Sequence, residues 1–171
     1  MKHLLVVYHS KTGHTKSLVD AVCRGIEQTN TQLSSEAEEP ALTLRCLQAQ
    51  KASFEDLLWA DGLVLATPEN FGYMSGAMKD FFDRTYYEVG EQFAPLPYLL
   101  IVGAGNDGSG AVRAIERIAK GYPLIAVAPA LISALKAEEI PVNNPTPEKT
   151  ILDKCEELGA TLAAGVDLGM Y

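Results

Sequence analysis

Four short apolar runs restrict the fold of this chain more than any other feature. They occupy residues 4–8, 42–47, 62–67 and 98–102. Runs of this length that are apolar almost throughout are typical of strands covered on both faces. A fifth run, residues 124–133, contains Pro129, which predicts a strand that is broken or bent at that point. The runs therefore predict the strands of a buried parallel sheet.

Segments with helical spacing separate these runs. Apolar residues recur every three or four positions in 18–26, 74–82, 112–119 and 151–162, and a capping-box pattern at 53–56 predicts one further short helix. Strands that alternate with helices predict an α/β fold with helices on both faces of the sheet. Five such units in 171 residues favour the strand order 2-1-3-4-5. At about 150 residues per domain, we expect a single domain over residues 1–171.

Charge and cysteine content exclude several classes of protein. The chain carries 14 basic and 22 acidic residues, a net charge of -8, which argues against nucleic acid or an anionic membrane as the main partner. No apolar run reaches the roughly 18 residues of a membrane span. Cys23, Cys46 and Cys155 form no C-x-x-C pair, so we expect neither a disulfide framework nor a metal site. These features predict a cytoplasmic protein. Cys23 and Cys155 fall on apolar helical stripes and are interpreted as core thiols.

The sheet topology predicts where a ligand binds. In an open α/β sheet, ligands lie outside the carboxyl ends of the strands, at the point where the strand order reverses. In the order 2-1-3-4-5 that point lies between strands one and three. We therefore expect the loops after strands one, three and four to surround one crevice.

The first of these loops, residues 9–15, has the parts of a phosphate site. It offers hydroxyls at Ser10, Thr12 and Thr15, a glycine at Gly13, and the free amides of a starting helix. It is not a Walker loop, because no G-x-x-x-x-G-K-S/T occurs in the chain. Taken alone, the loop also fits an ordinary capped turn between a strand and a helix.

The other two loops are rich in aromatic residues and in glycine. In residues 67–76, Phe71 and Tyr73 are able either to lie against a flat ring or to pack on the core. Residues 103–110 contain G-x-G-x-x-G, but no acidic residue follows about 20 positions later, and the motif lies in the fourth unit. We interpret this segment as a glycine-rich loop that presents amides to a ring, rather than as a dinucleotide fingerprint.

Two stretches of the chain resemble a known family. Residues 8–15, followed by Leu18, resemble the FMN phosphate loop of flavodoxin-like proteins. The second stretch is similar to a motif of the Trp-repressor-binding type NAD(P)H:quinone oxidoreductases and of NADPH-dependent FMN reductases; it reads Pro68-x-x-Phe71-Gly72-x-Met74, then Met78-Lys79-x-Phe81-x-Asp83-x-Thr85. The resemblance covers most of the chain and implies a flavodoxin-like three-layer sandwich with a five-stranded parallel sheet.

The resemblance also implies a cofactor and its site. The FMN phosphate would be bound by Ser10, Thr12, Gly13, His14 and Thr15. The flavin ring near N5 would be lined by Pro68, Glu69, Asn70, Phe71 and Gly72. The pyrimidine edge of the ring would be held by Gly105, Asn106, Asp107 and Gly108. No catalytic side chain is singled out.

The implied activity is the reduction of quinones or similar small-molecule acceptors, with NAD(P)H as electron donor. The alternative is a flavodoxin-type one-electron carrier, which the acidic balance suits. The family's usual G-G-x-E after strand four is replaced here by Gly108-Ser-Gly110-Ala. A homo-oligomer is left open.

Overall fold

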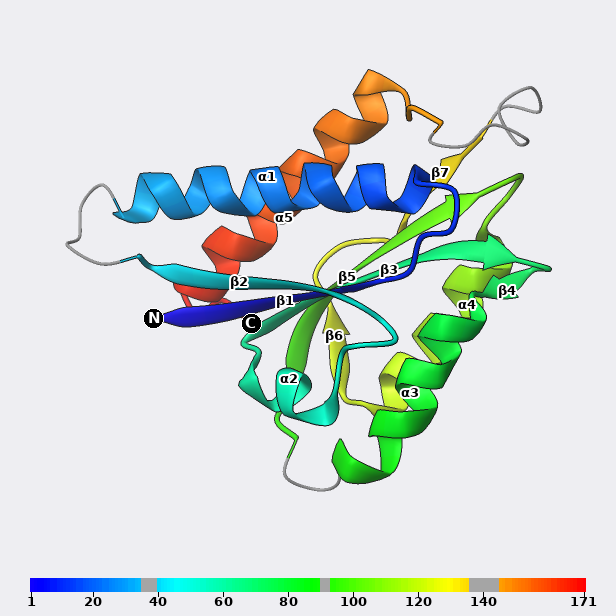
Figure 1. Ribbon diagram of the computed structural model, residues 1–171. Helices are drawn as coiled ribbons and strands as arrows, with labels where there is room; N and C mark the ends of the chain where they lie inside the picture. Colours follow the sequence, from blue (N-terminus) through cyan, green and yellow to red (C-terminus); the bar gives the residue numbers. More distant parts are fainter. Residues whose placement is uncertain (35–39, 90–92, 136–144) are drawn as a thin grey trace.

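A computed structural model describes residues 1–34, 40–89, 93–135 and 145–171. The strands are β1 (Lys2–Tyr8), β2 (Leu42–Gln48), β3 (Gly62–Asn70), β4 (Tyr73–Met74), β5 (Leu96–Ala104), β6 (Leu124–Ala126) and β7 (Leu131–Ala134). The helices are α1 (His14–Ser34), α2 (Phe54–Trp59), α3 (Gly76–Val89), α4 (Ser109–Gly121) and α5 (Lys149–Asp167). Helices α1 and α5 cover one face of the sheet, and α2, α3 and α4 cover the other (Figure 1). The predicted three-layer sandwich is confirmed.

The sheet has the predicted order. Its strands run β2-β1-β3-β5-β6, and every neighbouring pair on this path is parallel. The fifth position is shared by two short strands, because β6 pairs with the start of β5 and β7 pairs with its end. Pro129 lies in the break between them. Proline has no N–H group to donate to a neighbouring strand, which explains the break. The predicted interruption of the strand is confirmed.

Each face of the sheet has its own apolar core. In β1, Leu5 and Val7 belong to the cluster under α2, α3 and α4, whereas Leu4 and Val6 belong to the cluster under α1 and α5. Alternate side chains of a strand point to opposite faces, so a strand that is covered on both sides must be apolar throughout. This is why the apolar runs of the sequence coincide with the central strands.

Beyond Pro68 the chain forms a hairpin that the sequence did not predict. The predicted strand ends at Thr67, but β3 continues to Asn70 and pairs antiparallel with β4. The strand tolerates Pro68 because β1 ends at Tyr8, opposite Ala66, so no neighbour on that side requires an N–H. Phe71 and Gly72 form the turn with φ of 52° and 70°, the positive values of a type I′ hairpin.

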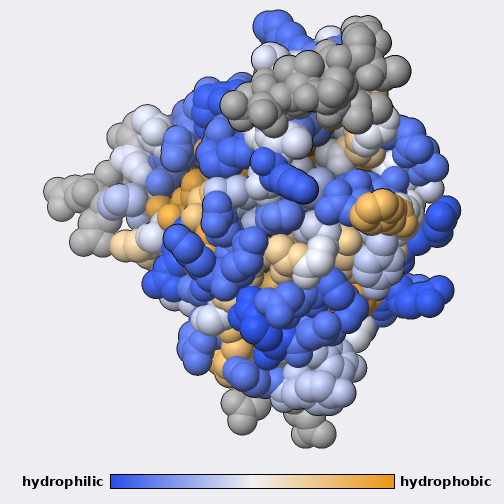
Figure 2. Space-filling view, turned by 45° about the vertical axis from the view of Figure 1, so that its right-hand side comes forward, coloured by the Kyte–Doolittle hydropathy of each residue, from blue (hydrophilic) through white to orange (hydrophobic). Residues whose placement is uncertain are grey.

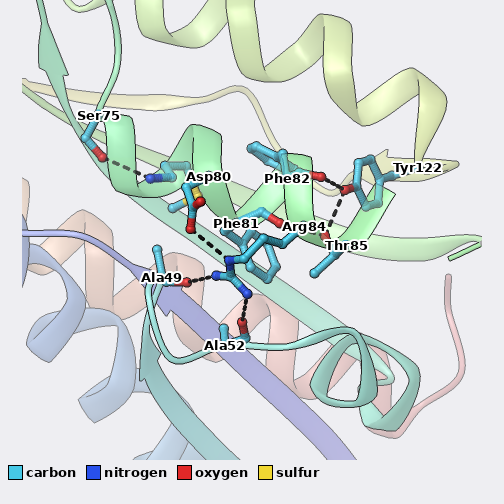
Figure 3. A network of polar contacts seen from close by, with 10 residues as sticks. Ala49, Ala52, Ser75, Asp80, Phe81, Phe82, Arg84, Thr85 and Tyr122 are labelled. Carbon is cyan, nitrogen blue, oxygen red and sulfur yellow. Dashed lines mark hydrogen bonds and ion pairs between the residues drawn. The ribbon is translucent and has the colours of Figure 1, made fainter. Parts of the chain in front are cut away.

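Helix α3 is tied to the elements around it (Figure 3). At its start, the Ser75 N–H donates to the buried Thr67 hydroxyl at 3.1 Å, and the Ser75 hydroxyl accepts from the Met78 N–H at 3.3 Å. Farther along, the Arg84 guanidinium donates to the carbonyl oxygens of Ala49 and Ala52, at 2.8 and 3.1 Å. These bonds fix the helix that carries the base of the hairpin.

The face of the molecule in Figure 2 is mostly hydrophilic. Figure 2 shows one face on which hydrophobic residues occur only in small, separate patches. Among the described residues, no helix is long and apolar enough to cross a bilayer. Within the same residues, no three His, Cys, Asp or Glu side chains are grouped to hold a metal ion.

Candidate functional site

The loops after β1, β3 and β5 meet in one pocket of about 180 Å³. The pocket lies at the carboxyl ends of the strands, and its walls are Lys11, Thr12, His14, Thr15, Pro68, Glu69, Asn70, Gly103, Ala104, Gly105 and Leu135. The prediction that these three loops surround one crevice is therefore confirmed. Of the residues expected to bind FMN, seven line this pocket: Thr12, His14, Thr15, Pro68, Glu69, Asn70 and Gly105.

Ser10 and Gly13 shape the first loop from within. The Ser10 hydroxyl accepts the N–H groups of Gly13 and Lys16, both at 3.2 Å. Gly13 adopts φ of 95°, a conformation that glycine reaches without the Cβ clash of other residues. The Ser10 hydroxyl thus folds the loop over the start of α1, so that the helix N-terminus faces the pocket.

The first turn of α1 lies against Gly103 of β5. The His14 side chain is buried, and its Nε2 lies 3.1 Å from the Ser133 carbonyl oxygen. No atom among the described residues hydrogen-bonds the Thr15 hydroxyl. A Cβ added at Gly103 would lie 2.7 Å from His14 Cδ2 and 3.0 Å from Thr15 Oγ1. The absence of a side chain at Gly103 therefore leaves room for His14 and Thr15 at the pocket. The sequence analysis did not predict this role of Gly103.

His9 precedes the loop and has a buried nitrogen without a partner. Its backbone N–H donates to the Ala66 carbonyl oxygen at 3.0 Å, which continues the ladder beyond β1. Its Nδ1 is buried and makes no hydrogen bond within the described residues. Burial lowers the pKa of His9, and the nearby Lys11 lowers it further. Its Nδ1 is therefore a hydrogen-bonding group that the described residues leave available at the start of the loop.

The hairpin of the second loop lies directly on the start of α4. A Cβ at Gly110 would lie 1.9 Å from the Gly72 carbonyl oxygen, so the two backbones are in contact there. The Glu69 carboxylate accepts the Ala111 N–H at 3.0 Å. Glu69 thus uses one oxygen to tie the hairpin to the first turn of α4.

Phe71, at the tip of this hairpin, is completely exposed. The alternative that it packs on the core is therefore wrong. Tyr73 is also exposed, though less so. A bulky aromatic residue with positive φ and no packing partner is unusual, and such residues are concentrated at functional sites.

The third loop is held by its own side chains. The Asp107 N–H donates to Asn106 Oδ1 at 2.6 Å, and the Ser109 N–H donates to Asp107 Oδ1 at 2.5 Å. The hydrogen bonds from Ser109, followed by the charge of Arg113, lower the pKa of Asp107. Gly108 takes φ of 72°. Asn106, Asp107 and Gly108 do not line the pocket, but they set the course of the loop that presents Gly105 to it.

Leu135 is a wall residue that the sequence analysis did not identify. It follows β7, and its N–H donates to the Ala104 carbonyl oxygen at 2.8 Å. It reaches the pocket because β7 ends at the same edge of the sheet as β1, β3 and β5. The rule that ligands bind at the carboxyl ends of the strands therefore also applies to the segment after β7. We had expected only the loops after the first, third and fourth strands to line the pocket.

The donor set of the pocket fits a phosphate and a flat ring. A helix N-terminus carries free N–H groups and a partial positive charge, and the unpartnered Thr15 hydroxyl and Lys11 lie beside it. On the opposite side, Pro68, Asn70 and Gly105 offer backbone and amide groups with little bulk. These residues fit FMN without requiring a metal.

Comparison with known proteins gives partial matches by sequence and a full-length match by fold. A flavodoxin of Aquifex aeolicus is 39% identical over 83 residues, which cover 48% of this chain and 40% of the relative. A NAD(P)H dehydrogenase (quinone) of Acidithiobacillus ferrooxidans is 34% identical over 96 residues, covering 50% of this chain and 48% of the relative. The matched regions thus span less than half the length of these relatives. The structure of a flavodoxin from the domain Archaea superposes with a TM-score of 0.75 at 21% identity, over 96% of this chain and 98% of that one.

The family assignment rests on a longer match. Residues 3–134 match the model of the family described as NADPH-dependent FMN reductase. The matched segment contains all three loops of the pocket. The chain therefore belongs to the NADPH-dependent FMN reductase family and is a flavodoxin-like, FMN-binding protein.

Proposed function

We propose that the protein is an FMN-dependent oxidoreductase that takes electrons from NAD(P)H and passes them to a quinone or a similar small molecule. The exposed Phe71 carries this proposal. Hydride transfer requires the nicotinamide to stack on one face of the flavin ring, so that face must stay open. Phe71 is the largest side chain of the hairpin tip, and it covers nothing.

The residues of the pocket and of the loops beside it divide into three roles. Thr12, His14 and Thr15 would hold the phosphate through backbone N–H groups and hydroxyls at the start of α1. Pro68, Glu69, Asn70, Phe71 and Gly72 would border the ring, and the loop from Gly105 through Asn106 and Asp107 to Gly108 would meet its pyrimidine edge. When bound, FMN supplies the redox chemistry, and the protein holds the ring in place and leaves one face accessible.

The net charge of -8 opposes the approach of a nicotinamide dinucleotide. Two cationic side chains near the pocket offset this repulsion. Lys11 lines the pocket, and Arg113 lies beside Gly72 and Tyr73 in the first half of α4. Neither forms an ion pair within the part of the chain that the structure describes. Both are therefore available to the phosphates of the donor.

A one-electron carrier is the second candidate. The acidic surface favours it, because such a surface steers docking to a basic partner protein. The partial match to a flavodoxin supports it as well. A carrier needs only an exposed ring edge, whereas the oxidoreductase needs a nicotinamide on the ring face.

Steady-state kinetics separates the two candidates. The FMN-loaded protein is mixed with NADPH or NADH and a benzoquinone, with free FMN at the same concentration as control. The oxidoreductase is expected to turn over between about 1 and 1000 times per second. A rate no greater than that of free FMN with both donors would contradict the proposal and favour the carrier.

A further inference from the structure

Cys46 of β2 faces helix α1. Leu42 and Leu44 of this strand belong to the apolar cluster under α1 and α5, and side chains two positions apart point to the same face. Arg45 points the opposite way, with its guanidinium 3.9 Å from the Trp59 ring centre of α2. Cys46 therefore lies on the α1 side of the sheet, where β2 is the edge strand and leaves the thiol exposed.

A single stripe of α1 lies over Cys46. Lys16, Asp20, Cys23 and Glu27 are spaced by four, three and four residues, which places them on one side of the helix. All four interact with the Cys46 thiol. Cys23 is only partly buried against the cluster under α1, so the interpretation of Cys23 as a core thiol is wrong.

The Asn30 side chain near the end of α1 hydrogen-bonds the backbone of Leu42 at the start of β2, so α1 lies along β2 and brings Cys23 beside Cys46. The neighbouring Cys23 thiol is the largest cause that lowers the pKa of Cys46. The charge of Lys16 acts in the same direction, while burial, Asp20 and Glu27 oppose it. The pKa of Cys23 is raised, first by its interaction with Cys46 and then by burial. Cys46 is thus the more acidic and more accessible thiol, and Cys23 keeps its proton beside it.

We propose that Cys23 and Cys46 form a redox-active dithiol, in which a hydroperoxide oxidises Cys46 and Cys23 then closes a disulfide. In the first step the Cys46 thiolate attacks the peroxide oxygen; the O–O bond breaks, hydroxide or alkoxide leaves, and Cys46 becomes a sulfenic acid. In the second step Cys23 sulfur attacks Cys46 sulfur, the S–O bond breaks, and the Cys23 proton leaves with the hydroxyl as water. Two electrons pass from the dithiol to one hydroperoxide.

The reaction is confined to this pair. Cys155, the third cysteine, is fully buried, and burial raises its pKa to about 12. It lies on α5, away from the edge strand. The proposal does not rest on FMN or on electron transfer to quinones, so it stands or fails independently of the proposed function.

The test counts free thiols after oxidation. The reduced protein is freed of reductant, treated with hydrogen peroxide, denatured and alkylated with N-ethylmaleimide, and its intact mass is measured. We expect alkylation of one cysteine instead of three, and a peptide that links Cys23 to Cys46. Three alkylated cysteines after treatment, or a link that includes Cys155, would overturn the proposal.

Three variants assign the roles. In Cys46→Ala, both remaining thiols should survive the same peroxide dose. In Cys23→Ala, Cys46 should be oxidised without disulfide closure, so dimedone should trap its sulfenic acid. Cys155→Ala is the matched control and should form the disulfide as the wild type does. Loss of Cys23 in the Cys46→Ala variant, or an unreactive Cys46 in Cys23→Ala, would show that Cys46 is not the attacking thiol.

Discussion

The Glu69 carboxylate accepts the backbone N–H of Ala111 at 3.0 Å and so joins the hairpin after β3 to the first turn of α4. The hairpin carries Glu69 and Asn70, which line the pocket, and α4 follows the loop that presents Gly105 to it. A carboxylate at a helix N-terminus is also favoured by the helix dipole. Glu69 therefore fixes the position of the hairpin relative to the segment that follows Gly105, and the ring is proposed to bind between these two segments.

Loss of this carboxylate should destabilise the FMN-free protein. Glu69→Ala removes a hydrogen bond to a charged group, which contributes about 1.5 to 3 kcal/mol to the free energy of unfolding. Glu69→Gln should lose less, because its amide oxygen accepts the same N–H. Urea denaturation of the FMN-free protein measures both. Glu157→Ala, at an exposed site on α5, is the matched control. If Glu69→Ala is as stable as this control, the bond does not hold the hairpin against α4.

Gly103→Ala should close the space at the start of α1. The added Cβ would approach His14 Cδ2 to 2.7 Å and Thr15 Oγ1 to 3.0 Å, so one of these side chains must move. We expect the dissociation constant for FMN to rise at least about tenfold, a change of about 1.4 kcal/mol. Gly76→Ala is the control, because nothing lies within 4 Å of its added Cβ. Flavin fluorescence titration measures both, and equal affinities would contradict the placement of the phosphate.

Thr12→Ala should discriminate between FMN and riboflavin. A hydrogen bond to a charged oxygen is worth about 1.5 to 3 kcal/mol, so FMN should bind at least about tenfold more weakly. Riboflavin lacks the phosphate and should bind the variant and the wild type equally. Similar losses for both ligands would show that Thr12 supports the loop and not the phosphate.

The ionisation of Tyr122 should lower the free energy of unfolding in strong base. Burial raises its pKa from 10.0 to about 12, and its hydroxyl donates to the Phe82 carbonyl oxygen at 2.6 Å. The unfolded state therefore loses this proton first as pH rises. The free energy of unfolding should fall between pH 10 and about 12 by on the order of 2 kcal/mol. Denaturation across this range should show a smaller decline for Tyr122→Phe. An unchanged decline would place the titration elsewhere, for example at Tyr98, whose pKa burial also raises.

The sequence predicts the sheet and the place of the pocket because both follow from short patterns. A strand buried on both faces must be apolar throughout, and the order of five such strands determines which loops meet. The contacts that shape the walls depend instead on distant residues. Nothing near Glu69 in the sequence indicates that it accepts from Ala111, and the hairpin is tolerated only because β1 ends at Tyr8. Gly25 and Gly159 let α1 and α5 meet backbone to backbone, yet each reads as an ordinary helical glycine.

Anaerobic stopped-flow mixing of the FMN-loaded protein with NADPH, and separately with NADH, tests the central claim most directly. The oxidised flavin absorbance reports the reduction in a single turnover, without any assumption about the acceptor. We expect one of the two donors to bleach the flavin completely, at a rate that saturates with donor concentration and is at least that of steady-state turnover with a benzoquinone. A flavin that neither donor bleaches, but that dithionite reduces, would contradict the account.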